Sequence, residues 1–471
     1  MFNNFLDNFL LLTDIYKESQ HEQTPPGTTR SFAYFSSRGG AYATTTLFGL
    51  QYFLMRYFAG RVVTRKKIAE AKEIAHYHFR RPDIFNEVGW NHILEKHNGH
   101  LPLHIRAVHE GTVVPTGNIL FSVENTDDKT EWLTGHAETL LSNVWDPMTV
   151  ATHSGEFRKI ILRGLEQTGT PELIDNMLVD FGARGVSCPE EAAIAGAGHL
   201  VQFDATDNIP AIKLVRTFYD EKDPGHSIPA AEHRTVTAWG RHGEAAAVRN
   251  MIQKFPGAII AMPGDSYDIF NMCENVLGRE LREEILKRDG VFVVRPDSGD
   301  PASTVCRVLG ILGERFGYTV NKKDYKVLNP HIRVIQGDGI TIQALHAIIT
   351  SMTLAGWSLD NICFGSGGGL LRKLDRDTQR CKYAGSSVCI NGVWHDTWKD
   401  PITDPGKRSK AGRLTLISEP DTGGNPSMRT VREGDIPPNG IDLLGTTFLN
   451  GRMMRRECME GVRRLARAMA A

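Results

Sequence analysis

Short apolar runs that end in polar or glycine-rich steps recur along the chain from about residue 176. The runs lie at residues 177–179, 200–203, 258–262, 291–294, 332–335 and 362–364. Segments with a helical period lie between several of them, at residues 267–288, 304–316 and 341–354. Apolar strands that alternate with helices predict a parallel sheet covered by helices on both faces. This many units favours a β/α barrel, with a doubly wound sheet as the alternative, and both architectures place chemistry at the carboxyl ends of the strands.

The two ends of the chain have a different pattern. Residues 52–74 have a helical period, whereas residues 101–123 read as extended pieces of a small antiparallel sheet. Near the other end, an extended stretch at 386–393 precedes a basic loop at 399–413, and a helix is expected at 453–470. The predicted fold class is therefore α/β, with a β/α barrel-like part and a mixed α+β part that contains antiparallel sheet.

Composition narrows the class of protein. The chain has 471 residues, of which 41% are hydrophobic and 23% charged, as expected for a globular protein with a sizeable core. Its formal net charge of -1 argues against nucleic-acid or anionic membrane partners, so any anion site must be built locally. The spacings of the seven cysteines fit neither a disulfide framework nor a zinc site. The apolar run at 9–12 has no basic flank, and no run reaches transmembrane length, so we expect a soluble cytoplasmic protein.

The glycine-rich segment at residues 364–370 (Phe-Gly-Ser-Gly-Gly-Gly-Leu) directly follows an apolar run. Consecutive glycines let backbone N–H groups approach a phosphate closely, although flexible loops also contain such runs. Two other strand ends combine acids with glycine, Asp297 within 295–299 and Asp338 within 336–339. Each acid could simply cap a helix or a turn. Together with the glycine segment they favour a sugar-phosphate site.

His233 is the best catalytic candidate. It ends the segment Pro-Ala-Ala-Glu-His in a loop of the barrel pattern, where acids such as Asp265 can face it. A single histidine is more often structural, so the context carries this interpretation. Basic residues that could converge as a pyrophosphate clamp are Arg38, Arg184, Arg295, Arg376, Lys399, Lys407 and Arg408.

These segments resemble the nicotinate/nicotinamide phosphoribosyltransferase family, nicotinamide phosphoribosyltransferases in particular, over nearly the whole chain. The matching stretches are residues 13–17, 48–52, 180–187, 227–233, 265–268, 295–299, 335–339, 364–371, 399–401 and 407–410. The resemblance implies a barrel domain at 146–376 and a mixed domain built from 1–145 and 377–471. It also implies a head-to-tail homodimer with two shared active sites.

The resemblance implies a site for nicotinamide and phosphoribosyl pyrophosphate. The nicotinamide ring would stack between Phe181 and Tyr16 of the partner subunit. Asp207 would accept from the carboxamide NH₂ and Arg295 would contact its oxygen, and a carboxylate there disfavours nicotinate. Asp297 would hold the ribose hydroxyls.

The remaining implied contacts involve phosphate groups. Gly337, Gly367 and Gly368 would bind the 5′-phosphate, and Arg184 and Asp338 also belong to the substrate site. Pyrophosphate and ATP, with magnesium, would be held by Arg38, Arg376, Lys382, Lys399 and Lys407.

The implied reaction is attack of the ring nitrogen on the anomeric carbon as pyrophosphate leaves, so positioning and leaving-group electrostatics dominate. In the family, the histidine that matches His233 is phosphorylated by ATP, and Asp265 and Glu232 would orient it. The product would be nicotinamide mononucleotide for NAD salvage.

The chain departs from the family pattern in three places. Arg234 stands where a small hydroxyl residue is usual, and the loop at 39–41 is short. Ala384 stands where the family has a lysine, and Lys382 is a possible substitute. The competing interpretations are a nicotinate phosphoribosyltransferase, against which Asp207 argues, and a nucleotide-binding protein without catalysis.

Overall fold

The computed structural model describes residues 6–421 and 423–468. The chain divides into two compact units, which we call the sheet unit and the barrel unit. The sheet unit contains Met1–Thr152, Thr217–Asp220 and Asp375–Ala466, and the barrel unit contains His153–Arg216, Glu221–Leu374 and Arg467–Ala471. The main boundaries between the units lie after residues 152 and 374. The resemblance implies domain boundaries after residues 145 and 376.

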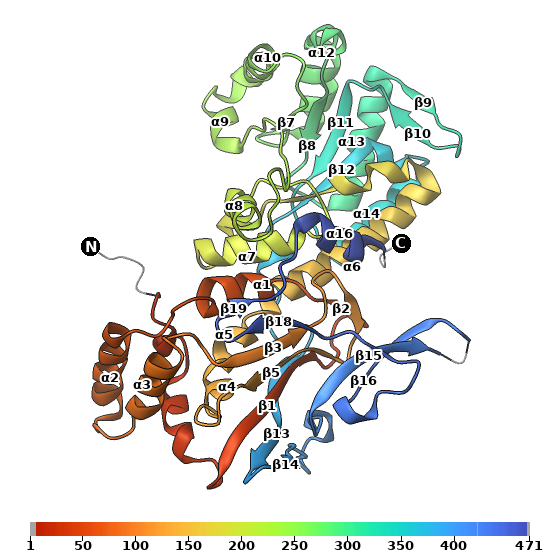
Figure 1. Ribbon diagram of the computed structural model, residues 1–471. Coiled ribbons are helices and arrows are strands. Elements are labelled where there is room, and N and C mark those ends of the chain that lie inside the picture. Colours follow the sequence, from red (N-terminus) through yellow and green to blue (C-terminus); the bar gives the residue numbers. More distant parts are fainter. Residues whose placement is uncertain (1–5, 422, 469–471) are drawn as a thin grey trace. The chain divides into compact units, whose positions relative to one another are not determined.

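A parallel sheet forms the centre of the barrel unit (Figure 1). Its strands run in the order β6-β12-β11-β8-β7. They are β6 (Leu178–Asp180), β7 (Ile260–Pro263), β8 (Phe292–Arg295), β11 (Ile332–Gln336) and β12 (Ile362–Ser366). β7 is wholly buried and β12 nearly so, as expected for strands covered on both faces. The strands β9 (Tyr318–Val320) and β10 (Lys326–Leu328) form a separate two-stranded antiparallel sheet in this unit.

Isolated bridges close this sheet into a barrel. They are parallel, and they pair Asp180 with Thr206, Ala205 with His226 and Ala230 with Ala261. The edge strands β6 and β7 are thus joined through segments 205–206 and 226–230, which confirms the predicted barrel-like fold. The expected strand at 200–203 is wrong, because Leu200 caps the end of α7 (Pro189–His199) and these residues form turns. Burial at a helix end gives the same apolar run as a buried strand.

Helices lie between the strands of the barrel unit. They are α6 (Trp145–Thr168, shared with the sheet unit), η4 (Pro171–Asn176), η5 (Gly182–Arg184), α7, α8 (Ile209–Phe218), α9 (His233–Thr237), η6 (Arg241–Gly243), α10 (Glu244–Lys254), α11 (Ile269–Asn271), η7 (Met272–Glu280), α12 (Arg282–Lys287), α13 (Pro301–Phe316), α14 (Ile342–Leu354), η8 (Leu359–Asn361) and α15 (Gly368–Leu371). The side chains of Asp300 and Thr341 accept backbone N–H bonds at the starts of α13 and α14. The helices expected at 304–316 and 341–354 are confirmed, whereas the segment 267–288 is broken into α11, the π-helical η7 and α12.

The sheet unit is built on a seven-stranded sheet in the order β14-β13-β1-β5-β3-β18-β19. The strands are β1 (Thr28–Ser37), β3 (Leu103–Ala107), β5 (Ile119–Asn125), β13 (Cys381–Ile390), β14 (Val393–Asp396), β18 (Gly445–Leu449) and β19 (Arg452–Met453). Smaller sheets contain β2 (Thr44–Thr46) with β4 (Val113–Pro115), and β15 (Leu414–Pro420) with β16 (Pro426–Arg432) and β17 (Ile441–Asp442). β1 pairs antiparallel with β5 and β13, so strands from both chain ends share one sheet. The expected antiparallel sheet at 101–123 is confirmed.

The helices of the sheet unit differ in part from expectation. They are η1 (Phe9–Leu11), η2 (Ile15–Glu22), α1 (Leu50–Phe53), η3 (Leu54–Phe58), α2 (Arg65–Phe79), α3 (Glu87–Lys96), α4 (Leu133–His136), α5 (Glu138–Ser142), η9 (Pro405–Lys407), η10 (Glu433–Asp435) and α16 (Met459–Ala468). The single helix expected at 52–74 is wrong, because Gly60 turns at positive φ and Thr64 starts α2 as its N-cap. The helix expected at 453–470 begins only at Met459, and residues 469 and 470 lie outside the described residues.

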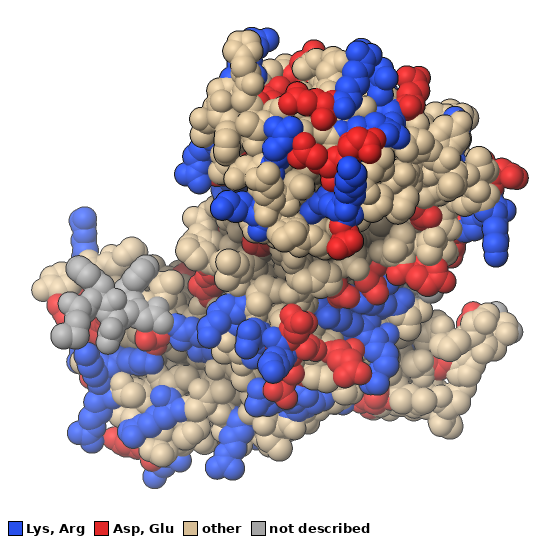
Figure 2. Space-filling view, turned by 90° about the horizontal axis from the view of Figure 1, so that it is seen from above, with Lys and Arg blue, Asp and Glu red and all other residues tan. Residues whose placement is uncertain are grey.

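The surface carries charges of both signs. Figure 2 shows basic and acidic side chains interspersed over the face in view, in agreement with the net charge of -1. Among the described residues, no helix is both long enough and apolar enough to cross a membrane.

A buried carboxylate in the sheet unit predicts a pH-dependent stability. Glu110 accepts bonds from the N–H groups of Gly49 (3.0 Å) and Gln51 (2.6 Å) and from the hydroxyl of Tyr219 (2.8 Å). Burial outweighs these bonds and raises its pKa from 4.5 to about 7. The folded state therefore binds the proton more tightly, so the contribution of Glu110 is full below about pH 4.5 and is lost as the pH rises through 7. This difference is worth about 3 kcal/mol.

Thermal unfolding of the wild type and of Glu110→Gln between pH 5 and 8 tests this prediction. The melting temperature of the wild type should fall relative to the variant by about 2–4 °C over that range. The same substitution at the exposed Glu95 is the matched control and should produce no such trend. A difference in melting temperature between the wild type and Glu110→Gln that does not change with pH would show that Glu110 stays ionised throughout.

Candidate active site

The carboxyl ends of the barrel strands surround a cavity of about 850 Å³. Many of the predicted residues line it, namely Phe181, Arg184, Asp207, Glu232, Arg295, Asp297, Gly337, Asp338, Gly367 and Gly368. Residues from six separate chain segments therefore meet at this mouth of the barrel. Charged groups and backbone amides share this surface, which suits a polar, phosphate-bearing ligand.

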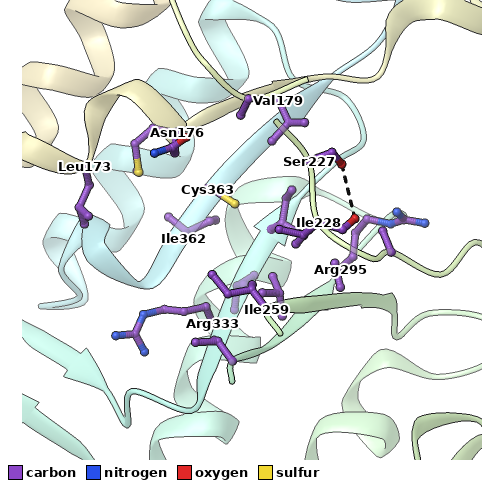
Figure 3. A pocket seen from close by; sticks show the side chains of 18 of the residues that line it. Leu173, Asn176, Val179, Ser227, Ile228, Ile259, Arg295, Arg333, Ile362 and Cys363 are labelled. Atoms are coloured by element: carbon purple, nitrogen blue, oxygen red, sulfur yellow. Dashed lines mark hydrogen bonds between the residues drawn. The ribbon is translucent and has the colours of Figure 1, made fainter. Parts of the chain in front are cut away.

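A second cavity of about 560 Å³ occupies the interior of the barrel. Figure 3 shows Val179, Ile228 and Cys363 along its wall, with Ser227 and Arg295 toward one end and Arg333 toward the other. Its lining is mostly apolar. Four residues line both cavities, Phe181, Asp207, Ala230 and Arg295, so the apolar interior and the polar mouth meet at these side chains.

The ring of Phe181 lies directly on the glycine-rich segment. Phe181 follows β6, and its backbone N–H donates to the carbonyl of Ser366 at 2.9 Å. A Cβ added at Gly365 would lie 2.0 Å from Cε2 of the ring, so any other residue there would displace the ring. Gly337 borders the same ring, with Phe181 and Arg295 about 3.3–3.4 Å from its would-be Cβ. Gly368, in contrast, has open space at this position, so its backbone is accessible from the mouth.

Asp207 and Arg295 bring opposite charges to the two cavities that Phe181 also lines. Asp207 accepts a short hydrogen bond from the hydroxyl of Ser227, drawn as a dashed line in Figure 3. The Nε of Arg295 is buried and has no hydrogen-bond partner within the described chain. A buried donor without a partner is costly, which favours a ligand with an acceptor at this point.

Asp180 holds the backbone next to Phe181 and Asp207 in place. It is fully buried at the end of β6, where it accepts from the N–H of Gly182 (2.7 Å) and the amide of Asn208 (2.9 Å). Burial, together with the neighbouring charge of Asp207, raises its pKa to about 6. Its carbonyl also accepts the N–H of Asp207 at 3.0 Å. Asp180 therefore fixes the backbone on which Asp207 and Phe181 stand.

His233 lies between two carboxylates. It is the first residue of α9, and its Nε2 is 3.0 Å from Oδ1 of Asp265, which follows β7. Its Nδ1 is 3.7 Å from Oδ2 of Asp297, which follows β8. The hydroxyl of Ser298 donates to the other oxygen of Asp265 at 2.6 Å. Burial raises the pKa of Asp297, although the charge of Arg295 opposes this effect.

Glu232 has other partners than the expected His233. Its side chain accepts the N–H of Thr235 in a capping box at the start of α9. It also pairs with Arg234, whose Nη2 is 2.8 Å from Oε1. Glu232 therefore positions α9 as a whole and holds Arg234, which is largely exposed.

Three of the expected pyrophosphate residues gather in the sheet unit. Lys382 lies in β13 opposite Ser36, and Arg38 follows the end of the paired strand β1. Burial and the positive charges of Arg38 and Lys399 lower the pKa of Lys382. Ala384 lies two residues along the same strand and so on the same face as Lys382. The structure therefore places Lys382 beside the position of the missing lysine.

The other expected residues of the sheet unit are exposed. Arg376 lies 3.8 Å from Asp377, and Lys407 lies 3.1 Å from Asp404. Tyr16, in η2, is 56% exposed. An aromatic ring with this exposure is available to a ligand or to another chain.

Asp180, Asn208, Ser227 and Ser298 are the residues that sequence reasoning missed. All four act through other side chains, by holding Asp207, Asp265 or the backbone beside them. The matching segments included Asp180, Ser227 and Ser298, but no motif distinguishes such supporting residues from their neighbours. Only the folded geometry identifies them.

Comparison with known proteins gives consistent matches. The model of the nicotinate phosphoribosyltransferase (NAPRTase) family matches residues 177–435, and that of the nicotinamide phosphoribosyltransferase N-terminal domain matches residues 8–105. A nicotinamide phosphoribosyltransferase of Xanthomonas campestris pv. campestris (strain 8004) is 48% identical over 464 residues, covering 98% of each chain. That of Acinetobacter baylyi is 29% identical and covers 99% of this chain and 98% of its own.

Two solved structures share the fold. Nicotinate-nucleotide pyrophosphorylase from Pyrococcus furiosus superposes with a TM-score of 0.64 at 12% identity, covering 100% of this chain and 97% of the other. Human nicotinic acid phosphoribosyltransferase gives a TM-score of 0.57 at 16% identity, covering 97% and 93%. At these identities the likeness shows the fold alone.

Proposed function

The chain belongs to the nicotinate phosphoribosyltransferase family, and from this premise we propose that it is a nicotinamide phosphoribosyltransferase of NAD salvage. It would make nicotinamide mononucleotide and pyrophosphate from nicotinamide and phosphoribosyl pyrophosphate. We place this activity in the cytoplasm, in a homodimer whose sites are shared between subunits.

The observation that carries the proposal is that Asp207 and Arg295, of opposite charge, line the same two cavities as the Phe181 ring. A carboxamide needs one acceptor for its N–H₂ and one donor for its oxygen, and these two side chains supply both. A pyridine ring stacks well on an aromatic face, and Tyr16 of the partner subunit would cover the other face. A carboxylate ligand would instead meet the charge of Asp207.

The strand ends beside this pair suit the phosphoribosyl group. Gly337, Gly367 and Gly368 offer backbone N–H groups to the 5′-phosphate, and Asp297 and Asp338 offer carboxylates to ribose hydroxyls. Arg184 lines the same cavity and adds a positive charge.

Electrostatics would drive the reaction. The ring nitrogen forms a bond to the anomeric carbon while the bond to pyrophosphate breaks, so the leaving group carries the electron pair. The carboxylates at the mouth are oxygen donors of the kind that magnesium prefers, and a bound magnesium would neutralise the pyrophosphate. The cations of the sheet unit, Arg38, Arg376, Lys382, Lys399 and Lys407, are proposed to hold the pyrophosphate and ATP.

We also propose that ATP phosphorylates His233. The hydrogen bond to Asp265 favours the proton on Nε2, which leaves the lone pair of Nδ1 as the nucleophile. A bond from Nδ1 to the terminal phosphorus would form as the bond to ADP breaks. The modified group would stand beside Asp297 at the substrate cavity, where it can alter substrate binding.

The test of the proposal is product formation with magnesium, with and without ATP, with nicotinamide and nicotinate as parallel substrates. The expected result is formation of mononucleotide from nicotinamide but not from nicotinate, in an amount that ATP increases. Product from nicotinate alone would overturn the substrate assignment, and no product from either base would overturn the proposed activity.

Lys382 provides a further prediction. Because Arg38 and Lys399 lie close to it, Lys382→Ala should raise KM for phosphoribosyl pyrophosphate about tenfold, the effect of losing about 1.4 kcal/mol of charge-assisted binding. Adding Ala384→Lys to this variant should restore most of the loss, because the two positions share a strand face. Lys66→Ala, at an exposed position of α2, is the matched control. Unchanged KM in Lys382→Ala would remove this residue from the pyrophosphate site.

A further inference from the structure

Two histidines and an aspartate of the sheet unit converge on one point. His92 lies in α3, His97 is the C-cap of that helix, and Asp127 follows β5 (Figure 1). Nε2 of His92 is 3.0 Å and Nε2 of His97 is 2.9 Å from Oδ2 of Asp127. One ligand atom from each of the three residues lies within 4.8 Å of the other two.

The backbone holds this cluster in place. The N–H of His97 donates to the carbonyl of Ile93 at 3.1 Å, which fixes the end of α3. The carbonyl of Asp127 accepts from the amide of Asn125 and from the hydroxyl of Thr130, each at 2.8 Å. These bonds fix the backbone positions from which the side chains of His97 and Asp127 reach the cluster.

A backbone contact orients the carboxylate. The N–H of Lys129 donates to Oδ1 of Asp127 at 2.8 Å, and Oδ2 lies within hydrogen-bond distance of both imidazoles. Neutral imidazole and ionised carboxylate are the forms that bind metal ions.

We propose that His92, His97 and Asp127 bind a divalent transition-metal ion of the zinc type. Zinc takes imidazole nitrogen at about 2.0–2.1 Å and carboxylate oxygen at about 2.0–2.2 Å, so tetrahedral ligand atoms stand about 3.3 Å apart. The two nitrogen–oxygen distances reach this spacing by opening a few tenths of an ångström, and the two imidazole nitrogens lie within 4.8 Å of each other. Two nitrogen donors disfavour magnesium and calcium, which prefer oxygen.

The surroundings suit a fourth ligand from solvent. The three side chains are 16–23% exposed, so an ion can enter and water can complete its coordination. The ion would tie the C-terminal end of α3 to the loop after β5. It would bind the folded unit and not the unfolded chain, and so would raise the melting temperature. The inference does not rest on the proposed transferase activity.

Equilibrium dialysis of the metal-free full-length protein against zinc chloride tests this site. The wild type should bind one tight equivalent, and His92→Gln and His97→Gln should each weaken it at least 100-fold. His76→Gln and His78→Gln, at exposed positions of α2, are matched controls that should retain it. Zinc should raise the melting temperature of the wild type but not of His97→Gln. Failure to bind, or binding that survives both His92→Gln and His97→Gln, overturns the proposal.

X-ray absorption spectroscopy of the wild type loaded with one equivalent of zinc gives a test that depends on no variant. Two imidazoles and oxygen ligands are the expected coordination. A spectrum with fewer than two imidazoles, or with sulfur, places the ion elsewhere and overturns the proposal, whatever the folding of the variants.

Discussion

Replacing Asp207 with asparagine should lower the preference for nicotinamide over nicotinate by about 100-fold, equivalent to about 2.7 kcal/mol. Ser227 uses one oxygen of this carboxylate, and the other can accept the carboxamide N–H₂. An asparagine keeps the size of the side chain but removes its charge. The preference should therefore fall because nicotinamide is bound less well and nicotinate is tolerated.

The charge accounts for most of this effect. Two carboxylates about 4 Å apart repel each other by about 4 kcal/mol at the effective dielectric of a partly buried site. Arg295 lines the same two cavities and offsets part of that repulsion, so a smaller net penalty is expected. Loss of a hydrogen bond to the carboxamide adds about 1 kcal/mol to the change for nicotinamide.

The ratio of kcat/KM values for the two bases measures this prediction. Asp289→Asn is the matched control, because Asp289 is exposed and precedes β8 at the end of the strand away from the site. The ratio for Ser227→Ala should lie between those of the wild type and Asp207→Asn, since this variant removes a hydrogen bond to the carboxylate but keeps its charge. If the ratio in Asp207→Asn stays within a factor of three of the wild type, another group must select the base.

Strand ends of the barrel could be predicted from sequence because their signal is local. The runs at 258–262, 291–294, 332–335 and 362–364 overlap β7, β8, β11 and β12, and the last three end within two residues of the mouth. Strands buried on both faces must be continuously apolar, and the polar side chains begin where the strand leaves the core. The same local signal identified the glycines beside Phe181.

Closure of the barrel could not be predicted in this way. The bridges at Ala205, His226 and Ala230 involve one or two residues each, and the segment 226–230 contains no apolar run. The run at 200–203 was misassigned because helix ends can be as apolar as strands. Such short pairings are fixed by the neighbouring strands, which lie far away in sequence.

The side chains that position the site residues could not be predicted from the sequence either. Ser298 is adjacent to Asp297, but its hydroxyl binds Asp265, and the acid next to His233 pairs with Arg234 instead. Side-chain direction decides these partners, and it depends on how β7, β8 and α9 are placed. The identity of a functional segment can thus be predicted more readily than the role of each residue within it.

Replacing His233 with alanine should abolish the effect of ATP while leaving basal transfer within about tenfold of the wild type. The basal reaction requires no proton transfer at this histidine, because the ring nitrogen attacks with its own lone pair and pyrophosphate leaves as an anion. The coupled reaction requires Nδ1 as a nucleophile, and alanine supplies none. Ser298→Ala should give a partial loss, since Asp265 keeps its bond to His233 but loses the one from Ser298.

Two measurements separate this role from a structural one. The wild type should incorporate the terminal phosphate of labelled ATP in an acid-labile form, and ATP should lower its apparent KM for nicotinamide; His233→Ala should show neither effect. His242→Ala, at an exposed position in η6 of the same region, should behave as the wild type. If ATP still lowers the KM of His233→Ala, a different residue carries the phosphoryl group. If the wild type itself shows no label and no ATP effect, Arg234→Ser becomes the first variant to test, because Arg234 directly follows His233 and departs from the family pattern.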